Sequence, residues 1–214
     1  MKCIVTAGPT YEPLDDVRRL TNFSTGRLGT ELAAFLRERG HDVTLLLGEQ
    51  ATYRNERQQS QACIFTTTEN LRAQLQALSK QRVDAVFHAA AVSDFTFGKV
   101  WLRSPSGETT AIKSGKISTR EGTLLAELLP TPKIIAELRQ CYPTARLVGW
   151  KYEVEGGRDD VIRLALRQIA ECQTDCVVAN GRAYGEGFGL VSGDGSVVHF
   201  RDKPALFDAL EKLP

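Results

Sequence analysis

The chain has 214 residues, of which 42% are hydrophobic and 25% charged, a composition that excludes a disordered chain and fits one globular domain over residues 1–214. It has no apolar run of the roughly 18 residues that cross a bilayer and no signal peptide, so we expect a cytoplasmic protein that binds no membrane. Its 27 Lys and Arg residues balance 26 Asp and Glu residues, which excludes the strongly basic surface that binds nucleic acid.

The first half of the chain alternates short apolar runs with amphipathic stretches, the pattern of βαβ units. Its predicted elements are strands over 2–6, 41–47 and 83–90 and helices over 27–39 and about 71–78. Gly40 lies where a glycine commonly ends a helix.

In the second half, no period is sustained from 96 to 121, which predicts a mobile loop or flap. The elements predicted after it are ordered residues 123–129, a helix opening at the proline of PTPKIIAEL, a strand over 146–150, a helix over 159–171, a strand over 175–180, a hairpin around 193–195 and a helix over 204–213. Together these elements predict an α/β, Rossmann-like three-layer fold with a mostly parallel sheet, plus a flap and a C-terminal β-hairpin.

The connection from the first strand to the first helix, residues 6–29, is much longer than such turns usually are. Ser24, Thr25 and Gly26 lie where backbone N–H groups and the helix dipole would face an anion, and Gly8 lies at the strand end. A phosphate fits that position, although a simple helix cap and a turn at Gly8 explain the segment equally well. The segment lacks the GxGxxG pattern, which disfavours an NAD-dependent dehydrogenase.

The third predicted strand ends in HAAAVSDF, where three alanines leave space for a flat group beside the backbone. Asp94 follows, and its carboxylate could accept hydrogen bonds from a ribose or a base, or simply form a turn. We interpret His88 as a core histidine with one satisfied ring nitrogen.

Two lysines of the segment IKSGKIST, Lys113 and Lys116, could bring positive charge to phosphate oxygens if this stretch closes over a substrate. Surface lysines on loops usually have no such role. The five cysteines are odd in number, lack the CxxC spacing and are interpreted as buried free thiols, while three scattered histidines predict no structural metal.

In this order the motifs resemble the phosphopantothenoylcysteine synthetase family over nearly the whole chain. The matching segments are AGPTYEPLDDVRRLTNFSTGRLG, AAAVSDF, KIS, LLPTPKII, VGWKYE and DCVVAN. The resemblance implies a nucleotide-binding ligase that joins 4′-phosphopantothenate and cysteine through an acyl-nucleotidylate, consuming CTP or ATP with Mg²⁺. It also implies a homodimer, for which the runs of the final hairpin could supply pairing edges, and it implies no flavin, because no decarboxylase domain is present.

The resemblance assigns catalytic roles to Asn22, which handles the acyl intermediate, to Arg18, and to a flap lysine. That lysine is Lys116 if KIS is aligned on the motif and Lys113 if the alignment has no gap. The nucleotide contacts that carry over are Ala90, Asp94, Pro132, Ile134, Ile135 and Trp150.

The chain departs from some family members at Gln168 and Cys172, where those members have lysines. Arg163 or Arg167 could compensate for the missing charge. The alternative functions are an NAD(P)-binding oxidoreductase, whose Tyr-xxx-Lys pair has no match at Tyr152 or Tyr184, and a diverged, non-catalytic nucleotide-binding protein.

Overall fold

The computed structural model describes residues 1–53, 61–112, 117 and 122–213. Its central sheet has eight strands in the order β13-β12-β11-β10-β6-β1-β4-β5. These strands are β1 (Lys2–Ala7), β4 (Asp42–Gly48), β5 (Cys63–Phe65), β6 (Ala85–His88), β10 (Arg146–Tyr152), β11 (Cys176–Asn180), β12 (Phe188–Ser192) and β13 (Val197–Phe200). The six strands from β5 to β11 pair in parallel, and the hairpin of β12 and β13 adds antiparallel pairs. The predicted sheet and hairpin are therefore confirmed.

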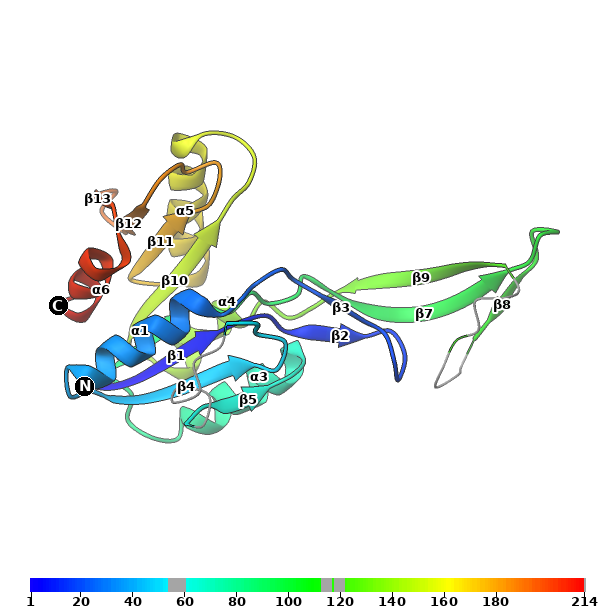
Figure 1. The fold of residues 1–214 in the computed structure, drawn as a ribbon, viewed down its shortest axis with the longest axis horizontal. Coiled ribbons are helices and arrows are strands. Elements are labelled where there is room, and N and C mark those ends of the chain that lie inside the picture. The colour runs from blue at the N-terminus through cyan, green and yellow to red at the C-terminus, as the bar shows by residue number, and fades with distance from the viewer. Residues whose placement is uncertain (54–60, 113–116, 118–121, 214) are drawn as a thin grey trace.

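Helices cover both faces of the sheet (Figure 1). One face carries α1 (Arg27–Glu38) and α6 (Lys203–Glu211), and the other carries α3 (Thr68–Leu78), α4 (Ile134–Cys141) and α5 (Arg158–Cys172). Side chains of a strand alternate between faces, so Leu147 enters one core cluster while Val148 enters another. This arrangement confirms the predicted three-layer fold.

A second sheet of three antiparallel strands forms an arm that extends away from the body (Figure 1). Its strands are β7 (Phe95–Arg103), β8 (Thr109–Ala111) and β9 (Thr123–Pro130), and a short hairpin of β2 (Tyr11–Pro13) and β3 (Arg19–Thr21) contacts it. We call the three strands β7, β8 and β9 the arm.

The prediction of an irregular loop over 96–121 was wrong for 96–103 and 109–111, which are strands. The register of β7 against β9 shifts between Phe97 and Val100. An irregularity of this kind interrupts the two-residue alternation by which strands are recognised in a sequence. The strand β7 is therefore stabilised by its pairing with β9 and could not be recognised from the local sequence pattern.

The cysteine prediction holds for three of the five thiols. Cys3, Cys172 and Cys176 are buried, Cys141 is half-buried, and all five are free. Cys63 is exposed, contrary to the expectation, because it lies in the short edge strand β5. Within the described residues, no helix is both long enough and apolar enough to cross a bilayer.

Candidate functional site

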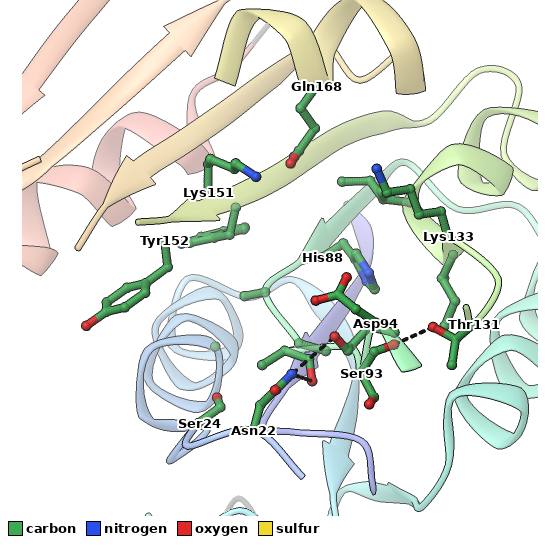
Figure 2. A pocket seen from close by; sticks show the side chains of 18 of the residues that line it. Asn22, Ser24, His88, Ser93, Asp94, Thr131, Lys133, Lys151, Tyr152 and Gln168 are labelled. Atoms are coloured by element: carbon green, nitrogen blue, oxygen red, sulfur yellow. Dashed lines mark hydrogen bonds between the residues drawn. The ribbon is translucent and has the colours of Figure 1, made fainter. Parts of the chain in front are cut away.

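A cavity of about 1250 Å³ opens at the carboxyl edge of the sheet, where ligands of open α/β sheets bind (Figure 2). Four segments form its walls: the end of the first crossover with the start of α1, the end of β6, the start of α4, and the end of β10 with one face of α5. Ten of the site residues expected from the sequence line it: Asn22, Ser24, Thr25, Gly26, Ala90, Asp94, Pro132, Ile134, Ile135 and Trp150.

Two glycines bring the start of α1 to the edge of the sheet. Gly26 is the N-cap residue, with φ of 76°, a conformation that favours glycine. A Cβ atom at Gly29 would lie 2.7 Å from the Ala7 Cβ, so only glycine allows this close approach of helix and strand. Gly26 itself has no side chain to cap the helix, and the Thr25 Oγ1 accepts only a long 3.3 Å hydrogen bond from the Arg27 backbone N–H. The start of α1 and its dipole therefore face the cavity.

Asn22 joins the crossover to the end of β6. Its Nδ2 donates to the carbonyl oxygens of Val92 at 3.2 Å and Ala91 at 3.4 Å (Figure 2). Both contacts are long, the Asn22 side chain is exposed, and its carbonyl oxygen accepts no hydrogen bond from the described residues, so the amide can also reach a ligand in the cavity.

The turn after β6 is held in place by hydroxyl groups. The Thr10 Oγ1 accepts from the Ser93 backbone N–H at 2.8 Å, and the Thr131 hydroxyl donates to the Ser93 carbonyl oxygen. Asp94 is exposed at the mouth of the cavity, and no hydrogen bond or ion pair engages its carboxylate within the described residues. The turn therefore presents one available carboxylate to the cavity.

His88 lies at the end of β6 with 6% of its surface exposed, and its Nδ1 is 3.0 Å from the Thr6 Oγ1. Burial lowers the pKa of the imidazole from 6.5 to about 4, so the ring is neutral at neutral pH. The expectation of a core histidine with one satisfied nitrogen is confirmed. The sequence did not indicate that His88 also lines the cavity.

Four cationic side chains line the cavity within the described residues, and three of them have carboxylate partners. Arg27 pairs with Glu31 at 2.6 Å, Arg167 with Glu171 at 2.7 Å and Lys151 with Glu153 at 3.0 Å; Lys133 has no such partner within the described residues. Lys133 is thus the cation that an anion can engage without breaking an ion pair.

The two arginines considered as replacements for the lysines absent from α5 differ in position. Arg163 pairs with Asp160 and does not line the cavity. Arg167 lines it but is engaged by Glu171. Instead, Lys133 and Lys151 both act electrostatically on the Cys172 thiol, so their charges lie near the α5 face that Gln168 and Cys172 present to the cavity.

Two expected site residues do not line the cavity. Arg18 forms an ion pair with Asp15 at 2.5 Å and donates to the Ile117 carbonyl oxygen at 2.7 Å, and this contact with Arg18 holds the pKa of Asp15 well below its usual range. Gly8 has φ of 81° and packs against Ala51 and Gly48 beneath the crossover. Lys113 and Lys116 lie outside the described residues.

Several lining residues escaped the sequence reasoning, among them His88, Thr131, Lys151, Tyr152 and Asn180, whereas Lys133 lies inside the expected helix start 132–135 but was given no role of its own. The motif PTPKII contained Lys133, and VGWKYE contained Lys151 and Tyr152, so charged and aromatic residues inside these motifs were the available signal. The buried Trp150 Nε1 has no hydrogen-bond partner within the described residues.

Comparison with known proteins identifies relatives over the whole described fold. The family model described as DNA/pantothenate metabolism flavoprotein C-terminal domain matches residues 1–212. The chain is 35% identical over 179 residues to the coenzyme A biosynthesis bifunctional protein CoaBC of Thermococcus kodakarensis. That alignment covers 84% of this chain and 41% of the relative, so the chain spans less than half of that protein's length.

Two solved structures share the fold. The DNA/pantothenate metabolism flavoprotein from Streptococcus pneumoniae is 26% identical with a TM-score of 0.83, and the match covers 99% of this chain and 97% of that one. A Cab2 mutant in complex with phosphopantothenate-cysteine is 19% identical with a TM-score of 0.69, covering 99% and 88% of the two chains.

Proposed function

Because the chain belongs to the family of the DNA/pantothenate metabolism flavoprotein C-terminal domain, we propose that it is a phosphopantothenate–cysteine ligase of coenzyme A biosynthesis. The observation that carries this proposal is the cavity itself. It gathers Asn22, the start of α1, Asp94 and the start of α4 around a volume large enough for two polyanionic substrates. The substrates would be 4′-phosphopantothenate, cysteine and CTP or ATP.

The proposed reaction has two steps. A carboxylate oxygen of 4′-phosphopantothenate attacks the α-phosphorus of the nucleotide, the bond to the β-phosphate oxygen breaks, and pyrophosphate leaves. The cysteine amine then attacks the acyl carbon, nucleoside monophosphate leaves, and the amine loses a proton. Both steps develop charge on oxygen, so the cavity would act by positioning the reactants and by stabilising that charge.

Two helix starts and one lysine supply the positive potential that such a reaction needs. The N-terminus of α1 and the N-terminus of α4 both face the cavity, and Lys133 is the N-cap residue of α4. Helix N-termini and ammonium groups both attract phosphate oxygens. We assign the triphosphate to the two helix starts and Lys133, and the acyl group to Asn22 at the end of the first crossover.

Magnesium fits the donor set as a companion of the triphosphate. Among the described residues there is no group of three His, Cys, Asp or Glu that could hold a metal ion alone. Nucleotide-bound Mg²⁺ needs only one or two protein carboxylates besides the phosphates, and Asp94 offers one. The ion would offset the negative charge of the phosphates.

The five free thiols support the proposed cytoplasmic location, where cysteines stay reduced.

The ligase function is tested by incubating the protein with 4′-phosphopantothenate, cysteine, Mg²⁺ and either CTP or ATP. We expect pyrophosphate release that depends on 4′-phosphopantothenate, and a product with the mass of phosphopantothenoylcysteine. Tight nucleotide binding without pyrophosphate release from either nucleotide would instead identify a non-catalytic binding protein.

We further propose that the protein forms a homodimer through the arm. The arm exposes Phe95, Leu125, Leu128 and Leu129, with 36–48% of each side chain accessible. In the part of the chain that the structure describes, β9 is an edge strand of this sheet, so it offers unpaired backbone groups as well. An apolar, projecting edge of this kind is typical of a surface that pairs with a second copy.

If the dimer forms through the arm, a charged substitution on the apolar surface of the arm should dissociate it. Leu128→Glu should weaken self-association at least about thirtyfold, the effect of losing one central interface residue, because it places a charge in the apolar contact. Sedimentation velocity measures the change. Val198→Glu is the matched control, since Val198 is 52% exposed on the C-terminal hairpin. Dissociation by the Val198 variant alone would move the interface to that hairpin, and a monomeric wild-type protein would refute the dimer.

A further inference from the structure

His88 is the buried titratable residue of the cavity that the proposed reaction leaves without a role. It ends β6, the strand between β1 and β10, and is paired in register with Thr6 on one side and Gly149 on the other. Its neighbours along the chain, Ala89 and Ala90, line the same cavity. The ring thus lies in the floor of the cavity, between the walls that carry the starts of α1 and α4 (Figure 2).

The hydrogen bonds of Thr6 determine which ring nitrogen carries the proton. The fully buried Thr6 Oγ1 accepts from the Ala90 backbone N–H at 3.1 Å and lies 3.0 Å from His88 Nδ1. Within the described residues, Nδ1 is the one acceptor within reach of the Thr6 hydroxyl hydrogen. A buried hydroxyl that donated to nothing would lose a hydrogen bond, so the hydroxyl donates to Nδ1 and the ring proton resides on Nε2.

The Nε2–H group has no partner within the described residues, although the ring is almost completely buried. The residues that line this cavity with His88 include Asp94, Lys133 and Lys151, and none of them forms a hydrogen bond or an ion pair with the ring. The Thr6 hydroxyl holds Nδ1, and this contact fixes the orientation of the ring and directs Nε2–H into the cavity. Hydrogen bonds of this kind orient histidines toward ligands.

We propose that His88 is a ligand-binding residue whose Nε2–H donates a hydrogen bond to a phosphoryl oxygen of the nucleoside triphosphate. The inference rests on the proposed nucleotide-dependent function. The starts of two helices face the same floor, which favours phosphate over the base at this position. Because the low pKa keeps the ring neutral, His88 contributes direction without charge, and the contact persists throughout the neutral pH range.

The first test compares His88→Leu with His88→Gln, whose amide nitrogen can replace Nε2 as a donor. Calorimetric titration with CTP and with ATP in the presence of Mg²⁺ should show roughly five- to tenfold weaker binding for His88→Leu, the effect of one neutral hydrogen bond. His88→Gln should bind within about twofold of wild type. Equal affinity of His88→Leu and wild type, or equal losses in both variants, would overturn the proposal.

The second test determines by NMR which nitrogen of the His88 ring carries the proton, in protein without nucleotide. It keeps the proposal testable if the His88→Leu variant does not fold. In ¹⁵N-histidine-labelled protein, His88 should show a protonated Nε2 and an unprotonated Nδ1 from about pH 5.5 to 8. Thr6→Val should lose this preference and Thr6→Ser should keep it. Because the chain has only three histidines, the His88 signals are assigned as those that disappear in the His88→Gln variant. A protonated Nδ1 in the wild-type protein would overturn the proposal.

The two proposals fail in different ways. Wild-type protein that binds a nucleotide but releases no pyrophosphate would refute the ligase function and leave the comparison of His88 variants valid. Wild-type protein that binds neither CTP nor ATP would refute the role of His88 as well.

Discussion

Asn22→Asp is expected to lower the turnover number of the ligation about 100- to 1000-fold, the usual effect of removing one donor that stabilises an oxyanion. The affinity for CTP or ATP should stay within about threefold of wild type, because the triphosphate is assigned to the two helix starts and Lys133 rather than to the Asn22 side chain. The physical reason is a change of sign. The Asn22 amide is a neutral donor, whereas an aspartate repels the negative oxygen that develops on the acyl group.

The aspartate would also face the carbonyl oxygens of Ala91 and Val92, to which Asn22 now donates, and this repulsion could loosen the crossover. Asn22→Ala separates the two effects, since it removes the donor without adding charge, and it should lose a similar factor in turnover. Steady-state pyrophosphate release measures turnover, and calorimetry measures affinity. Asn70→Asp, on α3 outside the cavity, is the matched control and should retain wild-type turnover. Wild-type turnover in Asn22→Ala would remove Asn22 from the catalytic residues.

The second large effect is expected at Lys133. Lys133→Met should weaken nucleotide binding roughly 10- to 100-fold, because a charge-assisted hydrogen bond to phosphate contributes about 1.5–3 kcal/mol. Lys151→Met should have a smaller effect, since the Lys151 ammonium is already engaged by Glu153 at 3.0 Å. Titration of each variant with CTP and ATP measures the change.

A second variant that moves the positive charge of Lys133 to another wall of the cavity is the control for this prediction. Gln168 lines the α5 wall of the same cavity, one helical turn before Cys172, on which the charge of Lys133 acts. Adding Gln168→Lys to the Lys133→Met variant should therefore recover most of the lost affinity. Lys80→Met, which removes an exposed lysine outside the cavity, should have no effect. A Lys133→Met variant that binds nucleotide like wild type would show that the phosphates lie elsewhere.

Part of the candidate site could be predicted because its residues belong to short contiguous motifs. Asn22 and Ser24 to Gly26 immediately precede a helix whose start was visible in the hydrophobic period, and Asp94 follows directly after a recognisable buried strand. The carboxyl ends of parallel strands meet at one edge, so these motifs could be placed together before any coordinates. The roles of Arg18 and of the flap lysine stay predictions, because Arg18 lies against Asp15 outside the cavity lining and Lys113 and Lys116 lie outside the described residues.

The sequence by itself determined the alternation of strands and helices, the parallel sheet and the C-terminal hairpin, because these follow from side-chain periodicity and turn residues within a few positions of one another. Only the tertiary structure decided that β7 and β8 are strands of an arm, since β7 pairs with β9, which lies beyond a segment without local signal, and β8 pairs in turn with β7. It also decided that His88, Lys133 and Lys151 share one cavity, because their proximity depends on the strand order β10-β6-β1 rather than on any spacing along the chain.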